Sequence, residues 1–263
     1  MNDAQTTTGD GLRTERIHFL DEVRGFDLIL MVFFHGFYTI GYLFGWSWGR
    51  TLFQFFAPSE AFFAGVFIFL CGLSCRLSRN NWKRGLLLLG VAAALSLVMG
   101  IAMPEEMIWF GILHFLAVSI LLFALLRPLL DKLPPLVGMF VCAALLLLTW
   151  WVPAYRESVF GIPGLFTLPV PETWREMPLL YPLGFSYVPG ADYFPLLPWI
   201  FCFLGGSYVG IWAKQGCFPR WMIRRRIPAL SWIGRHTLII YILHQPVIYA
   251  VCWIVYRLLG GAA

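Results

Sequence analysis

The sequence predicts an all-α, polytopic integral membrane protein: a bundle of about seven transmembrane helices with a cytoplasmic N-terminus. Three observations carry this prediction. Of the 263 residues, 59% are apolar and 13% charged, and the mean hydropathy is +0.74, whereas a soluble domain is usually about half apolar and about a quarter charged. Apolar runs of roughly 20 residues, the length that crosses a bilayer, recur along the chain. Basic residues gather in alternate connections between these runs.

The apolar runs define one membrane domain, residues 26–258, which follows a cytoplasmic N-terminal segment, residues 1–25. The first run is too long for the apolar part of a cleavable signal peptide, so we expect it to remain as an anchor. Residues 52–57 are also apolar, so the second span can begin earlier than Pro58. The predicted spans cover residues 26–45, 59–76, 84–103, 107–126, 134–153, 193–213 and 237–258.

The loop charges orient the chain. The N-terminal region and the second, fourth and sixth connections hold 15 of the 19 Lys and Arg residues. Because cytoplasmic loops carry the excess of Lys and Arg, the N-terminus is placed in the cytoplasm and the C-terminus outside. The same argument explains the net charge of +5 without a nucleic-acid partner. The longest connection, residues 154–192, lies outside and is rich in Pro, Gly and aromatic residues, so we expect it to pack on the bundle and to contribute to binding.

Several ionisable residues fall within the apolar runs, where each is costly and therefore a functional hypothesis. By residue count His35, His114 and His244 lie in the middle half of the membrane. Structural alternatives remain open, since a membrane histidine can simply bond a neighbouring helix. Asp27 can pair with Arg24 one turn earlier, and Glu60 can pair with Arg50. Asp192 can serve a substrate or cap the sixth span, which it precedes.

Arg24 and His35 lie on nearly one face of the first helix. They are eleven residues apart, which is three turns plus about 20° and a rise of roughly 16 Å. Arginine pairs well with phosphate, and imidazole is the usual general base near neutral pH. This layout favours a long anionic substrate that enters from the cytoplasm and reaches the histidine with its reactive end.

The opening RIHFLDEVRGFDLILMVFFH resembles the first helix of the transmembrane acyltransferase superfamily. Four further blocks resemble the bacterial branch of the heparan-α-glucosaminide N-acetyltransferase catalytic-domain family. The five blocks occur in the expected order and extend over nearly the whole chain. The four are AGVFIFLCGLSCRLS (64–78), FGILHFLAVSILL (110–122), ADYFPLLPW (191–199) and GRHTLIIYILHQPV (234–247).

This resemblance implies a multi-pass acyltransferase of the bacterial inner (cytoplasmic) membrane. The donor would be acetyl-CoA or another acyl-CoA in the cytoplasm, and the acceptor a hydroxyl or amine, usually of a sugar or glycan, on the outer side. His35 matches the histidine after R-G, the expected catalytic base, and Arg24 matches the arginine of R-G. By the same resemblance, the lysosomal members of the family have asparagine at the position that matches His35. Their catalytic histidine follows in the next loop. The corresponding loop here, residues 43–60, has no histidine, so the base would be His35 or His114.

The predicted site therefore has three parts. The catalytic residues are His35 and His114. The acceptor site comprises Asp192, His244 and Glu60, and either His114 or His244 could donate to the thioester oxyanion. Acyl-CoA would bind on the basic residues of the cytoplasmic side, namely Arg24, Arg76, Arg79, Lys83 and Arg84.

Other functions stay open at this point. The main alternative is a proton-coupled transporter or flippase for a sugar or lipid-linked substrate, against which the sequence shows no internal repeat. A non-catalytic membrane component is a further alternative, and so is a haem or metal site on the three histidines. We expect no metal, because no pair of histidines is spaced i, i+4. The six cysteines form no disulfide framework, and Cys71 and Cys75 are interpreted as packing residues. A homodimer is left open.

Overall fold

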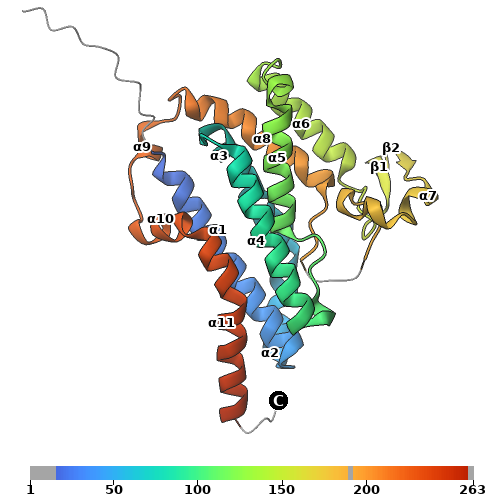
Figure 1. The fold of residues 1–263 in the computed structure, drawn as a ribbon, viewed down its shortest axis with the longest axis vertical. Helices are drawn as coiled ribbons and strands as arrows, with labels where there is room; N and C mark the ends of the chain where they lie inside the picture. The colour runs from blue at the N-terminus through green and yellow to red at the C-terminus, as the bar shows by residue number, and fades with distance from the viewer. Residues whose placement is uncertain (1–15, 189–191, 260–263) are drawn as a thin grey trace, which may run out of the picture.

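The computed structural model describes residues 16–188 and 192–259, and it confirms the all-α membrane architecture (Figure 1). Only one short hairpin interrupts the helices of these described residues, formed by β1 (Val159–Ile162) and β2 (Phe166–Pro169). The main helices are α1 (His18–Tyr38), α2 (Ser47–Phe56), α3 (Glu60–Leu77), α4 (Asn81–Ala102), α5 (Ile112–Leu130), α6 (Pro135–Thr149), α8 (Leu196–Lys214), α10 (Pro228–Arg235) and α11 (Thr237–Leu258). Shorter helices are α7 (Glu172–Arg175) and α9 (Arg220–Ile223), with 3-10 turns at Ala57–Ser59, Pro104–Glu106 and Pro178–Leu183.

Within the described residues, six helical segments are long and apolar enough to cross a membrane. The fifth of the seven predicted spans, residues 134–153, is instead the 15-residue helix α6. This helix rises only about 22 Å, whereas the hydrocarbon core is about 30 Å thick. It ends early because the chain turns at Trp150, whose carbonyl accepts from Arg156 and whose ring lies 4.1 Å from that guanidinium. The six spans are His18–Leu43, Ser47–Leu77, Asn81–Ala102, Ile112–Leu130, Leu196–Lys214 and Thr237–Leu258.

Two helix boundaries differ from the prediction. Helix α1 begins at His18 rather than at residue 26, because its charged first turns are buried against partners. The carboxylate of Glu22 accepts from the backbone amides of Arg226 (2.6 Å) and Ile227 (2.9 Å), just before α10. Helix α5 begins at Ile112 rather than at residue 107, after a 3-10 turn and an extended segment. The second span does begin early, since α2 continues through a 3-10 turn into α3.

Glycines allow two pairs of helices to approach closely. A Cβ on Gly72 of α3 would lie 1.9 Å from the Phe203 carbonyl oxygen of α8, and a Cβ on Gly206 would lie 2.0 Å from that of Phe69. Helices α1 and α10 meet in the same way, because a Cβ on Gly25 would lie 2.1 Å from the Leu230 oxygen. Membrane helices associate through such small residues, since lipid supplies no hydrophobic drive between them. The glycine of R-G is therefore required by the contact with α10.

The connection of residues 154–192 packs on the bundle, as predicted. Val152, Val170 and Phe185 form a buried apolar cluster with residues from the hairpin and from the start of α8. On the other side of the molecule, α11 extends away from the bundle (Figure 1). Its outer half exposes large apolar side chains such as Val251, Trp253 and Leu258, as expected for a lipid-facing helix.

Candidate active site

Two histidines from helices far apart in sequence meet in the membrane. His35 of α1 and His244 of α11 have ring centroids 5.1 Å apart. Gln245, the neighbour of His244, lies with its amide nitrogen 3.4 Å from His35 Nδ1, and its amide oxygen accepts from the buried Thr39 hydroxyl at 3.2 Å.

Polar contacts continue from the pair to Tyr241 and Asp192. His244 Nδ1 lies 2.5 Å from the Tyr241 carbonyl oxygen, and the Tyr241 hydroxyl donates to Asp192 at 2.9 Å. The same carboxylate oxygen accepts from the backbone amide of Ile112 at 3.3 Å. Burial raises the pKa of Asp192, and the two hydrogen bonds act in the opposite direction. Asp192 therefore accepts a hydrogen bond from the first backbone amide of α5. It does not cap α8, whose N-cap is Pro195.

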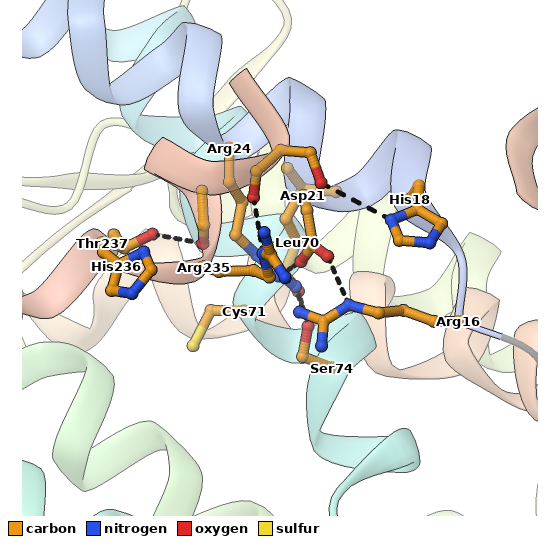
Figure 2. A network of polar contacts seen from close by, with 12 residues as sticks. Arg16, His18, Asp21, Arg24, Leu70, Cys71, Ser74, Arg235, His236 and Thr237 are labelled. Carbon is orange, nitrogen blue, oxygen red and sulfur yellow. Dashed lines mark hydrogen bonds and ion pairs between the residues drawn. The ribbon is translucent and has the colours of Figure 1, made fainter. Parts of the chain in front are cut away.

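A second polar cluster lies near the cytoplasmic start of α1 (Figure 2). Arg24 donates to Asp21 at 3.2 Å, to the Leu70 carbonyl at 3.3 Å, and to the Ser74 hydroxyl. The predicted pair of Arg24 with Asp27 is wrong, and Asp27 Oδ1 is buried without a partner. The reason is directional, because helical side chains lean toward the N-terminus and Arg24 therefore reaches back to Asp21.

Arg84 of α4 joins this cluster through the neighbouring positions of α3. Its guanidinium contacts Cys71 Sγ at 3.6 Å and Cys75 Sγ at 3.8 Å. Arg24 and Arg84 are electrostatic neighbours of one another and of Cys71. Thiols are weak acceptors, and Asp21 is shared between Arg24 and Arg16. The cluster therefore carries more positive than negative charge.

The other basic residues of the predicted acyl-CoA site are placed differently. Arg79 and Lys83 are exposed at the turn between α3 and α4. Arg76 is buried, pairs with Asp131, donates to the Ser207 carbonyl at 3.1 Å and lies over the Phe123 ring at 5.0 Å. Arg76 thus joins α3, α5 and α8 rather than facing the cytoplasm.

Replacing Asp131 by alanine should destabilise the protein by about 1–3 kcal/mol. Loss of one partner from a buried ion pair costs about 3–5 kcal/mol, but the Asp131 side chain is 43% exposed, which reduces the loss. Arg127→Ala is the matched control, because Arg127 forms an exposed i, i+4 pair with the same carboxylate at 3.5 Å and should contribute at most about 0.5 kcal/mol. Thermal unfolding in detergent would measure both, and equal losses would contradict the structural role of Arg76.

His114 and Glu60 lie outside the histidine pair. His114 Nε2 is 3.4 Å from the Ser96 hydroxyl, and its ring packs on Phe110. Glu60 is exposed on the first turn of α3. The predicted pair of Glu60 with Arg50 is wrong: Arg50 donates to the Gly41 carbonyl at 3.4 Å and lies over the ring of Tyr42. Burial raises the pKa of Tyr155 in the connection of residues 154–192. Arg156 and Trp199 oppose this, and the charge of Glu60 adds a smaller increase.

Sequence reasoning missed Tyr241, Gln245, Cys71 and Ser74 as members of these clusters. The first two were detectable by their spacing, since they lie three residues before and one residue after His244. The contacts of Cys71 and Ser74 depend on which helices are neighbours. Among residues 16–188 and 192–259, no group of three or more His, Cys, Asp or Glu side chains is arranged to hold a metal ion.

The helix bundle, its histidine pair and its basic cluster at the start of α1 define a multi-pass membrane protein with a polar centre at depth. The family described as heparan-alpha-glucosaminide N-acetyltransferase, catalytic, matches residues 16–246. The chain belongs to this family. Membership indicates a membrane acetyltransferase, and the family in general uses acetyl-CoA. No curated protein and no solved structure matches the chain.

Proposed function

We propose that this protein transfers an acetyl or other acyl group from cytoplasmic acyl-CoA to a hydroxyl or amine on the outer side of the bacterial inner membrane. A sugar or glycan is the acceptor class. The observation that carries the proposal is the placement of two sites along one helix. Arg24 lies near the cytoplasmic start of α1, and His35 lies eleven residues further on, roughly 16 Å deeper on nearly the same face.

The cytoplasmic cluster would hold the CoA phosphates. Arg24 and Arg84 converge beside Cys71 with a shared excess of positive charge, and paired guanidinium donors suit phosphate oxygens. The exposed Arg79 and Lys83 would add long-range attraction for the nucleotide. Arg76 is left out, because its side chain is only 4% exposed and is enclosed between α3, α5 and α8, whereas that of Arg24 is 19% exposed.

The reactive end would lie at the histidine pair. A CoA molecule held at Arg24 and extended along α1 brings its thioester to His35 and His244. The acceptor would enter from the outer side, where Asp192 and Tyr241 provide polar groups next to the pair.

The test combines binding with transfer. In detergent, saturating acetyl-CoA should raise the melting temperature, since a ligand at 100 times its Kd stabilises the folded state by about 2.7 kcal/mol. Arg84→Ala should weaken this shift, whereas Arg225→Ala, which removes an exposed arginine that donates to the Pro228 carbonyl, should leave it unchanged. Proteoliposomes should then transfer labelled acetyl groups to amino sugars.

Two results would contradict the proposal. One is the absence of any thermal shift with acetyl-CoA or longer acyl-CoA. The other is sugar uptake by proteoliposomes without acyl-CoA, which would support the transporter alternative.

A further inference from the structure

The hydrogen bonds of the two histidines fix different tautomers of their neutral rings. His244 Nδ1 lies 2.5 Å from the Tyr241 carbonyl oxygen. A carbonyl can only accept, so Nδ1 must carry the hydrogen. In the neutral ring the other nitrogen, Nε2, then has a free lone pair. This nitrogen is buried without a hydrogen-bond partner, and His244 as a whole is only 8% exposed.

His35 is held in the opposite tautomer. The Thr39 hydroxyl donates to Gln245 Oε1 at 3.2 Å, which directs the amide nitrogen of Gln245 toward His35 Nδ1 at 3.4 Å. An amide nitrogen only donates, so His35 Nδ1 accepts and the hydrogen of the neutral ring is on Nε2. His35 therefore offers a donor where His244 offers an acceptor.

A buried imidazole nitrogen without a partner reduces stability. His244 nevertheless lies beside His35, with the two ring centroids 5.1 Å apart. This is the point where the thioester would lie. The sequence assigned the base to His35 or His114. His35 Nδ1 is already engaged by Gln245. His114 also has a buried ring nitrogen without a partner, Nδ1, but its ring lies beside Ser96 of α4 and not beside His35. Position and hydrogen bonding together therefore favour His244.

We propose that His244 Nε2 is the general base of acyl transfer, an assignment that rests on the proposed function. The acceptor hydroxyl or amine gives its proton to Nε2 as its oxygen or nitrogen bonds to the thioester carbonyl carbon. Collapse of the tetrahedral intermediate breaks the C–S bond, and Nε2–H returns the proton to the departing CoA thiolate. The products are the acylated acceptor and CoA, and no other reactant is needed. His35 Nε2–H donates to the oxyanion, and the Tyr241 carbonyl stabilises the transient imidazolium.

The decisive variant is His244→Asn. Its amide can still donate to the Tyr241 carbonyl, but it has no basic nitrogen. We expect kcat to fall by about 10²–10⁴-fold, while KM for acetyl-CoA and the acetyl-CoA thermal shift stay at wild-type values. His236→Asn is the matched control, since His236 Nδ1 makes the same kind of contact with the Trp232 carbonyl at 2.8 Å and should retain activity.

Two further measurements keep the assignment testable if the asparagine variant folds poorly. Added imidazole should restore part of the activity to His244→Ala and none to a variant that lacks Arg84. Nitrogen-15 NMR of histidine-labelled protein should show His244 protonated at Nδ1 and unprotonated at Nε2. Wild-type kcat in His244→Asn, or the opposite tautomer, would overturn the assignment. A wild-type protein that neither binds acetyl-CoA nor releases its thiol would overturn the proposed function itself.

Discussion

Replacing His35 by alanine is expected to lower kcat by about 10²–10³-fold, the loss typical of one removed oxyanion donor. His35 Nδ1 is engaged by Gln245, so the nitrogen that faces chemistry is the protonated Nε2. His35→Gln should retain more activity than His35→Ala, because a glutamine amide can place an N–H near the former Nε2 position. Initial rates at saturating acetyl-CoA and acceptor would measure both variants, and thermal shifts would show that acetyl-CoA still binds.

His114→Ala provides the comparison for this prediction. The predicted spans gave His114 a similar depth, but it lies in the first turn of α5 and its contacts are Ser96 and Phe110. Its removal should therefore cost far less than removal of His35. An equal or larger loss in His114→Ala would move the reaction centre to the contact between α4 and α5, and full activity in His35→Ala would remove His35 from the mechanism.

Hydropathy predicted the membrane class and most of the spans, because the bilayer constrains each helix separately. The errors occur where a contact between elements outweighs the local pattern. Residues 18–25 appeared too polar for a span, yet Glu22 is satisfied by backbone amides before α10. Residues 134–153 were apolar throughout, yet α6 ends at Thr149, where Arg156 binds the Trp150 carbonyl.

The candidate site was predictable in its residue types but not in its partners. Periodicity on α1 placed Arg24 and His35 on one face without reference to any other helix. It could not show that His244 is the neighbour of His35 while His114 is not, since the predicted spans gave all three a similar depth and helix adjacency arises only in the folded bundle. The same limit applies to Arg76, which looked like a cytoplasmic cation and is a buried contact between helices.

Gly206→Ala is expected to destabilise the protein by at least about 1–3 kcal/mol, the usual cost of overpacking. The added methyl carbon would lie 2.0 Å from the Phe69 carbonyl oxygen, and this backbone atom cannot turn aside as a side chain would. Helices α3 and α8 must separate instead. Gly90→Ala is the matched control: nothing lies within 4 Å of its added carbon, and alanine should stabilise α4 by up to about 1 kcal/mol. Unfolding in detergent compares the two, and equal stability would contradict the close packing.

A double variant tests whether the two glycines act on one contact. Gly72 faces the Phe203 carbonyl from α3 as Gly206 faces that of Phe69 from α8. If one separation of the helices relieves both clashes, Gly72→Ala and Gly206→Ala together should cost less than the sum of the single losses. Helix α3 also holds Arg24 through Leu70 and Ser74. Displacing it should therefore weaken acetyl-CoA binding even in the fraction that remains folded, which links the α3–α8 glycine contact to the cytoplasmic site.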